Sequence, residues 1–341
     1  MKKLISLVLA VLMLSVLLVG CGGGSSSTPA ADSTPAGDNA PANDGGSGDD
    51  TVNIIYVAHG LEDMFCNWLV SCVQAEIDAN HPNWNMEVLD GKLSADVQIE
   101  QLENAIAKTP DLIFYSAADM YICTPTVQRA QEAGIPVVMI QAPVWDDNDQ
   151  SVTPYVDCDM YEVGKMVAEY AMQQIPENAQ VAILIGPAGN MHSDLRYQGW
   201  TEVLATRPDI TVVDEQRADW DQAEAMRITE DWLQQYPDLV GVISLNDSMI
   251  LGAIEAAKSA GRELYTYGVD GMADGCNAVK EGFLTATALQ DARALAKGGI
   301  ELAERVLAGE QLTGEDVIHV DAALITADNV DEFLAIHEAN S

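Results

Sequence analysis

The sequence predicts an α/β fold made of two parallel sheets, each flanked by helices. Short β-branched runs alternate with segments of helical periodicity, which is typical of βα units. The alternation occurs twice along the chain. The roughly 290 residues after position 50 also exceed what one hydrophobic core usually organises. We therefore expect two lobes, each with its own sheet.

The first half of the chain predicts four strands. Apolar residues at helical spacing, such as Leu69 and Ile77, predict a helix between the first two of them. Thr124 is expected to cap a later helix with Pro125 at its first position, and Gly134 is expected to end it. The expected strands are Val52–Ala58, Trp84–Leu89, Leu112–Tyr115 and Pro136–Ile140.

The second half predicts five strands. Asp247 is expected to cap a helix that ends near Gly261, and Met272–Val279 is expected to form another helix before Gly282. The expected strands are Val181–Ile185, Ile210–Asp214, Val240–Leu245, Leu264–Val269 and Leu284–Leu289. Open parallel sheets bind ligands at the carboxyl ends of their strands, so the loops after these strands are where we expect a site.

The first 50 residues predict export and anchoring. Lys2 and Lys3 precede an apolar run, Leu4–Val19, that is shorter than the ~20 residues of a spanning helix. Leu18–Cys21 resembles the bacterial lipobox. Residues 1–20 are therefore expected to be a lipoprotein signal peptide, and Cys21 is expected to carry the lipid that anchors the protein outside the bacterial cell membrane. An uncleaved anchor is the alternative. Residues 21–50 lack aromatic residues and are expected to form a disordered tether.

The net charge of −37 argues against two kinds of partner. The chain has 53 acidic and 16 basic residues and no basic run, so nucleic acid and anionic lipid surfaces would repel it. We expect no nucleic-acid partner. The simplest explanation of the acidity is a solvated surface that keeps an exported protein soluble.

The motifs of common enzymes and metal sites are missing from the sequence. There is no G-x-S-x-G, H-E-x-x-H or Walker A motif and no strand-linked G-x-G-x-x-G. Without a C-x-x-C motif, the cysteines support neither a zinc ribbon nor a redox pair, and their disulfide state stays open. We expect no enzyme activity, no cofactor and no metal. The cysteines after Cys21 are Cys66, Cys72, Cys123, Cys158 and Cys276.

Planar polar and aromatic side chains follow the ends of the predicted strands. Amide, carboxylate and guanidinium groups match neighbouring hydroxyls, and an aromatic face packs against the C–H face of a sugar ring. This chemistry suits a neutral polyol. Asp270 and Asn246 could instead simply cap helices, and Trp68 fits a core position better than a ligand contact. The candidate residues are Phe65, Asp119, Gln141, His192, Arg196, Trp220, Asn246, Asp270 and Gln290.

Six short motifs occur in one order and spacing along the chain. They are Ala133–Val138, Arg196–Trp200, Ala218–Asp221, Leu245–Asp247, Gly268–Gly271 and Ala288–Asp291. From about residue 53 to 314 they resemble the ribose/galactose-type substrate-binding proteins of ABC importers, which belong to the periplasmic binding proteins of type 1. The resemblance implies two Rossmann-like lobes, joined by three crossovers, that close on a monosaccharide. It also implies a monomer that delivers this ligand to a membrane permease and its ATPase.

The resemblance assigns roles to the candidate residues. It implies that Phe65 and Trp220 stack on the sugar, whereas His192 matches a sugar contact only loosely. The family usually has an Asp-Arg pair after the fourth strand, where this chain has Gln141 and Ala142, so the charge-assisted bonds of the ribose-specific members are lost. Ribose is therefore not the expected ligand. The expected hydroxyl-binding residues are Arg196, Asn246, Asp270 and Gln290.

The three crossovers implied by the resemblance define the lobes. They place residues 51–157 and 291–317 in the N-terminal lobe and residues 158–290 and 318–341 in the C-terminal lobe. Other functions stay open: binding of a nucleoside or a cyclic polyol, a sensory co-receptor for a membrane kinase or chemoreceptor, or turnover of a sugar at Asp270 or His192. A DNA-binding repressor with the same core is excluded by the export signal.

Overall fold

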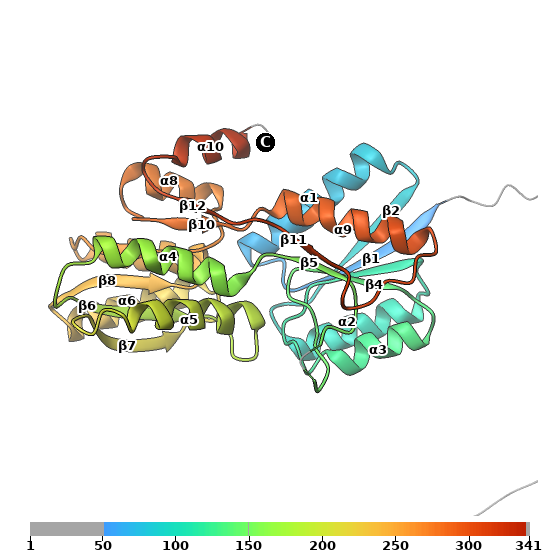
Figure 1. The fold of residues 1–341 in the computed structure, drawn as a ribbon, viewed down its shortest axis with the longest axis horizontal. Coiled ribbons are helices and arrows are strands. Elements are labelled where there is room, and N and C mark those ends of the chain that lie inside the picture. The colour runs from blue at the N-terminus through green and yellow to red at the C-terminus, as the bar shows by residue number, and fades with distance from the viewer. Residues whose placement is uncertain (1–50, 149, 339–341) are drawn as a thin grey trace, which may run out of the picture. The chain divides into compact units, whose positions relative to one another are not determined.

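The computed structural model describes residues 51–148 and 150–338 and confirms the α/β fold with two lobes (Figure 1). The predicted signal peptide, Cys21 and the tether lie outside these residues. Within the described ranges, no helix combines the length and the apolar character needed to cross a bilayer. The five cysteines in the described ranges are free thiols.

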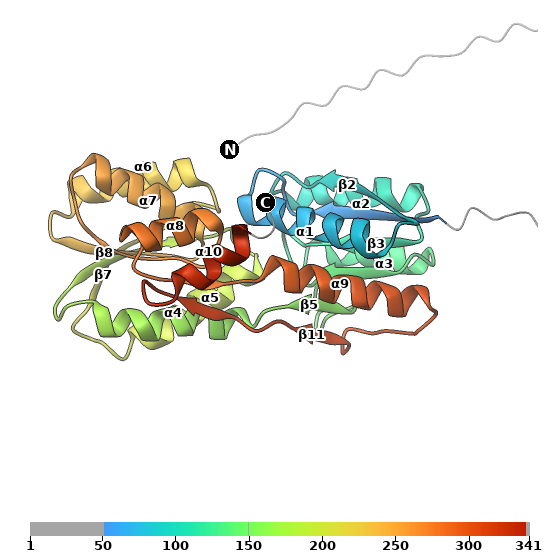
Figure 2. The same cartoon turned by 90° about the horizontal axis from the view of Figure 1, so that it is seen from above.

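The first lobe is built on a six-stranded parallel sheet with strand order β11-β5-β4-β3-β1-β2. Its strands are β1 (Val52–Ala58), β2 (Trp84–Asp90), β3 (Leu112–Tyr115), β4 (Val137–Ile140), β5 (Tyr155–Asp157) and β11 (Val317–His319). Its helices are α1 (Met64–Asn80), α2 (Ala95–Ala107), α3 (Thr124–Glu132) and α9 (Ala292–Leu307). Helices α1 and α9 lie side by side, although they are far apart in sequence (Figures 1 and 2).

Strand β1 illustrates how this sheet forms two cores. Ile54, Tyr56 and Ala58 point to the face that is covered by α1 and α9. Ile55 and Val57 point to the opposite face, which is covered by α2 and α3. Side chains alternate between the faces of a strand, so a sheet buried on both faces requires the continuous apolar run that predicted this strand.

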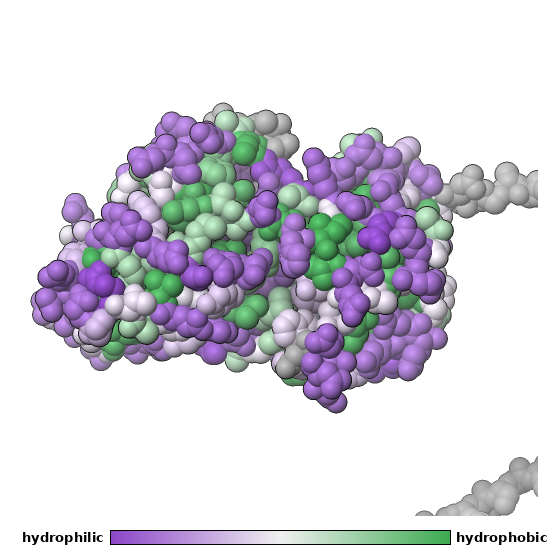
Figure 3. Space-filling view, in the orientation of Figure 1, coloured by the Kyte–Doolittle hydropathy of each residue, from purple (hydrophilic) through white to green (hydrophobic). Residues whose placement is uncertain are grey.

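The second lobe has a four-stranded parallel sheet with order β7-β6-β8-β9, and a two-stranded antiparallel sheet of β10 and β12. Its strands are β6 (Gln180–Ile185), β7 (Thr211–Arg217), β8 (Leu239–Ser244), β9 (Tyr265–Tyr267), β10 (Thr287–Leu289) and β12 (Ala323–Ile325). Its helices are α4 (Met160–Gln174), α5 (Met191–Leu204), α6 (Gln222–Gln235), α7 (Asp247–Ser259), α8 (Ala273–Glu281) and α10 (Val330–Glu338). On the face seen in Figure 3, hydrophilic side chains are spread over both lobes, with apolar patches between them.

The chain passes between the lobes at three places, from β5 to α4, from β10 to α9 and from β11 to β12 (Figure 1). The expected lobe boundary between residues 317 and 318 falls inside β11, and all three residues of this strand pair with β5. The three connections bring the carboxyl ends of the two parallel sheets toward each other, which positions the loops described below.

Two of the predicted helix caps are wrong by one residue. Thr124 is the first residue of α3, and Cys123 occupies the N-cap position without a side-chain bond. Asp247 is likewise the first residue of α7, where the Asn246 side chain accepts a hydrogen bond from the Met249 amide. Both residues lie in the first helical turn, where a hydroxyl or carboxylate also suits the local field. Gly282 ends α8 in the left-handed conformation, as predicted.

Candidate functional site

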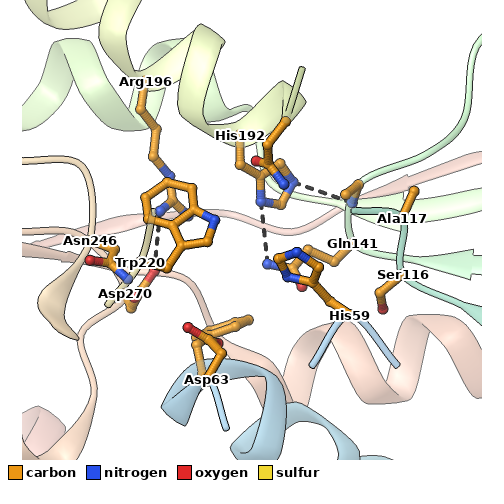
Figure 4. Close-up of a pocket in the computed structure, with 13 residues that line it drawn as sticks. His59, Asp63, Ser116, Ala117, Gln141, His192, Arg196, Trp220, Asn246 and Asp270 are labelled. Carbon is orange, nitrogen blue, oxygen red and sulfur yellow. Dashed lines mark hydrogen bonds and ion pairs between the residues drawn. The ribbon is translucent and has the colours of Figure 1, made fainter. Parts of the chain in front are cut away.

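A cavity lies at the carboxyl ends of the parallel strands, and both lobes line it (Figure 4). It has about 420 Å³ of empty space, including the part that is open to solvent. The first lobe contributes His59, Asp63, Phe65, Ser116, Ala117, Gln141 and Ala142, and the second contributes Asn190, His192, Arg196, Trp220, Asn246 and Asp270.

Arg196 is the buried centre of the second lobe's contribution. Its Nη1 donates to the Leu245 carbonyl at 2.7 Å and to Asp270 Oδ1 at 3.3 Å, and its Nη2 donates to Gln290 Oε1 at 2.7 Å. The guanidinium carbon also lies 5.9 Å from the centre of the Trp220 ring. A planar fork with this many partners has one orientation, so the guanidinium is fixed before any ligand binds.

Asp270 follows β9 with a φ of 126°, a conformation that L side chains rarely adopt. Its Oδ2 lies 3.4 Å from the Asp247 amide, and its backbone is paired with Leu289. The helix-cap alternative does not apply to Asp270, because α8 begins at residue 273 and its N-cap residue is Met272. The pairing with Leu289 holds Asp270 in this strained conformation, with its side chain at the cavity.

Burial governs the ionisation of both aspartates at this end of the cavity. Burial raises the pKa of Asp270 well above its usual value, although Arg196 opposes the shift. Directly behind Asp270, burial raises the pKa of Asp247 to about 7. Asp247 accepts hydrogen bonds from Thr287 Oγ1 at 2.7 Å and from the Met272 amide at 3.1 Å, so it ties β10 to the start of α8.

Trp220 packs its indole ring against the backbone of Gly186, where any larger side chain would overlap the ring. Trp220 has a φ of 68°, and the next residue, Asp221, caps α6 by accepting from the Glu224 amide at 2.6 Å. Only 8 % of Trp220 is exposed. The cap and the close approach at Gly186 together hold the ring face at the cavity.

Three helices begin at the cavity, and their cap residues line it. Asp63 caps α1, Asn190 caps α5 and Asn246 caps α7. Each cap uses a side-chain oxygen to accept from a backbone amide, so the remaining polar atoms of these side chains are available to a ligand. Asn246 therefore caps α7, as the alternative interpretation expected, and it also lines the cavity.

A hydrogen-bonded pair connects the lobes on the other side of the cavity. His192 Nε2 lies 2.7 Å from Asp157 Oδ2. His192 Nδ1 lies 3.2 Å from Gln141 Nε2 (Figure 4). A carboxylate only accepts, so these bonds fit the tautomer with its proton on Nε2 and a free Nδ1 lone pair. The Gln141 amide then donates to the ring, and the Ala142 amide donates to Asp157 at 3.1 Å.

His59, next to β1, is the other titratable imidazole of the cavity. Burial, with His192 nearby, lowers the pKa of His59 to about 4, so its ring is uncharged near neutral pH. Ser116 donates to the Ile140 carbonyl at 2.6 Å and lies 2.9 Å from the Tyr56 hydroxyl. The first lobe thus presents polar but mostly uncharged groups, with Asp63 as its one carboxylate among the lining residues.

Two of the predicted site residues lie outside the cavity wall. Gln290 is fully buried behind Arg196, and its Nε2 has no partner within the described ranges. Asp119 accepts from the Tyr121 and Ile122 amides and lies against Gly189 of the opposite lobe. The residues placed in the cavity as predicted are Phe65, Gln141, His192, Arg196, Trp220, Asn246 and Asp270.

Six lining residues were not predicted: His59, Asp63, Ser116, Ala117, Ala142 and Asn190. The sequence carried a signal for four of them. His59 and Ser116 directly follow strands whose ends were correctly predicted, and Asp63 and Asn190 are good N-cap residue types that precede helices. The short side chains of Ala117 and Ala142 gave no chemical signal.

Residues 54–311 match the family model of the periplasmic binding protein domain. The chain belongs to this family. It is 31% identical over 251 residues to a xylitol-binding protein of Mycolicibacterium smegmatis, which covers 72% of this chain and 70% of that protein. It is 28% identical over 239 residues to the ribose import binding protein of Salmonella typhimurium, which covers 70% of this chain and 79% of that protein.

A solved structure gives the same fold. An ABC transporter solute binding protein from Bacillus halodurans C-125, with bound myo-inositol, has a TM-score of 0.76 and 26% identity, covering 84% of this chain and 98% of that chain. The family consists of transport components that bind ligands, rather than enzymes. The comparisons therefore agree with the missing enzyme motifs.

Proposed function

We propose that this protein captures a monosaccharide, pentose or hexose, or a closely related polyol, and delivers it to the permease of an ABC importer. The observation that carries this proposal is the cavity itself. A fixed guanidinium, two carboxylates and two aromatic rings, Phe65 and Trp220, converge there from both lobes. Such groups bind neighbouring hydroxyls and the apolar face of a sugar ring.

The ligands of the relatives support this chemistry. Xylitol, ribose and myo-inositol are the ligands named for the compared proteins, and each carries a run of neighbouring hydroxyls. A cyclic polyol is a specific second candidate, because the 26% identical solved structure holds myo-inositol. The direct ligand contacts of this proposal are Phe65, Gln141, His192, Arg196, Trp220, Asn246 and Asp270, with Gln290 acting through Arg196.

Closure of the lobes is the proposed capture step. The Met120 amide lies 3.5 Å from the Gly189 carbonyl of the opposite lobe, and Gln141 and His192 also meet across the cleft. A ligand that contacts both lobes binds this arrangement more tightly than an open one, so it shifts the population toward closure. The permease and its ATPase would then recognise the closed monomer.

Anchoring through Cys21 completes the proposal. A lipid on this residue would hold the protein outside the cell membrane. Residues 21–50 would give a reach of roughly 30 Å if they behave as a flexible chain. Metabolic labelling with a palmitate analogue, compared with a Cys21→Ser variant, tests this part separately from ligand binding.

A thermal-shift screen of the form that starts at Gly22 tests the ligand class. A ligand that binds the native state raises the melting temperature by mass action. We expect one pentose, hexose, pentitol or inositol to raise it by several degrees and Trp220→Ala to abolish the shift. A shift with nucleosides alone would keep the fold but contradict the proposed ligand class.

A further inference from the structure

The cavity wall carries more carboxylates than cations. Asp63 and Asp270 line the cavity, and Asp247 is buried directly behind Asp270. Among the lining residues Arg196 is the one fixed cation, because His59 is uncharged near neutral pH and His192 is hydrogen-bonded to a carboxylate of its own, Asp157. One guanidinium therefore faces three aspartate side chains, and burial raises the pKa of each of them.

The charge of Arg196 opposes the rise in the pKa of Asp63, but Arg196 forms no hydrogen bond or ion pair with this side chain. The Arg196 donors are directed to Leu245, Asp270, Gln290 and the Met160 sulfur. The Asp63 carboxylate accepts from the Cys66 amide at 2.7 Å as the cap of α1. Within the part of the chain that the structure describes, no side chain donates to Asp63 or forms an ion pair with it. Asp63 is half-buried, and a carboxylate that is partly removed from water without a direct ion-pair partner carries a desolvation cost.

Asp63 and Asp270 come from opposite lobes and lie at the same end of the cavity, away from Ser116 and Gln141 (Figure 4). Burial in the cleft raises the pKa of Asp63, and the charge of Asp63 adds to the rise in the pKa of Asp270. Closing the empty cleft therefore brings together two carboxyl groups that repel each other when both are ionised. A ligand cation between them would turn this repulsion into attraction and favour closure.

We propose that the ligand carries a protonated amino group beside its hydroxyls, and that this group lies between Asp63 and Asp270. The inference rests on the proposed function and names the ligand class as amino sugars or amino polyols. An ammonium group has three donors, and its hydrogen bonds to carboxylates are stronger than those of a hydroxyl. The hydroxyls of the same ligand bind Arg196, Asn246 and Gln141.

Matched pairs of ligands test the proposal by titration calorimetry at pH 7. Each pair differs by one amino group: D-glucose and D-glucosamine, D-galactose and D-galactosamine, and scyllo-inositol and scyllo-inosamine. We expect at least one amine to bind about tenfold more tightly than its parent, which corresponds to about 1.4 kcal/mol. Equal or weaker binding of every amine, when a parent compound binds, overturns the inference and leaves the proposed function intact.

Asp63→Asn locates the amino group. Asparagine caps a helix about as well as aspartate, so this variant removes the charge and keeps the start of α1. The preference for the amine should fall to about one in Asp63→Asn and stay about tenfold in Asp159→Asn. The latter makes the same substitution at the exposed cap of α4. A preference that survives Asp63→Asn contradicts the assignment to Asp63.

Two further outcomes keep the test decisive. If Asp63→Asn does not fold, as judged by circular dichroism, Asp63→Ser removes the carboxylate while it retains a good capping side chain. If no member of any pair binds but a nucleoside does, the proposed function fails, and this inference fails with it. Binding of parents, of amines or of neither thus separates the two proposals.

Discussion

The two sides of the cavity are built differently. In the second lobe, Arg196, Asn246 and Asp270 are almost fully buried, and each is held by bonds within its own lobe. In the first lobe, His59, Asp63 and Gln141 are only half-buried. The Gln141 side chain donates to His192 across the cleft. The second lobe is therefore organised before closure, whereas part of the first lobe's site is completed by closure.

This difference separates affinity from selectivity. Groups that are fixed in advance lose little entropy when they bind, so the second lobe can supply most of the binding free energy. Groups that meet the ligand only on closure decide which ligands permit closure, so the first lobe governs selectivity. Replacing residues on each side should therefore have effects of different size and kind.

The largest effect is expected from Arg196→Met, which breaks the second lobe's network. The variant leaves the buried Asp270 and Gln290 without their partner, so both ligand affinity and the stability of the lobe should fall. We expect at least about a hundredfold loss of affinity, because the ligand loses its charge-assisted bonds to the guanidinium. The stability of the protein should fall by about 3–5 kcal/mol, because a buried charge loses its partner. Calorimetry and thermal unfolding measure the two effects.

The matched control for Arg196 is Arg227→Met on α6. Arg227 is exposed and forms ion pairs with Glu224 and Asp231 on the same helix. Exposed pairs of this kind contribute roughly 0–1 kcal/mol, so this control should bind ligand as the wild type does. If Arg196→Met retains its affinity within a few-fold, the second lobe's network does not supply most of the binding free energy.

The sequence predicted which loops of the second lobe lie near the cavity, because a parallel sheet places the carboxyl ends of its strands at one edge. Once the strands before Arg196, Trp220 and Asn246 are recognised, their position near the site follows from the fold. The very short strands β5, β11 and β12 were missed, because three residues carry no clear periodicity.

The first lobe's side was harder to predict for a physical reason. The bond between Asp157 and His192 joins residues 35 positions apart, and no local pattern encodes it.

Gln290 and Asp119 were correctly placed after strands, but the strand ends do not say which way a side chain turns. Gln290 turns back to hold Arg196, and Asp119 turns to its own loop and to Gly189 of the other lobe.

A smaller effect is expected from Asp157→Asn, which breaks the bond that spans the lobes. Loss of the carboxylate frees His192 to change its tautomer, so Gln141 loses its fixed orientation. We expect a loss of affinity of about three- to tenfold, the size of one hydrogen bond. Calorimetry of this variant, of His192→Gln and of the double variant measures how far the two residues act together.

The double variant decides whether Asp157 acts through His192. If it does, the double variant should lose about as much affinity as either single variant, because residues in one network are not additive. Fully additive losses would contradict the linked arrangement. Asp159→Asn, at the exposed cap of α4, serves as the control and should leave affinity unchanged.

The smallest effect on binding and the clearest effect of pH are expected from Asp247→Asn, next to Asp270 in the second lobe. Burial raises the pKa of Asp247 from 3.8 to about 7 in the folded protein. Its contribution to stability is therefore fully present below about pH 4 and is lost as the pH rises toward 7 and above.

Asparagine does not ionise and can keep the bonds to Met272 and Thr287. From pH 4 to pH 8 the melting temperature of the wild type should thus fall relative to that of Asp247→Asn by at least about 3 °C, roughly the effect of 1 kcal/mol. The exposed Asp238→Asn should follow the wild type across this range. A constant difference between the wild type and Asp247→Asn would show that this carboxyl is ionised throughout, and that the second lobe tolerates its charge.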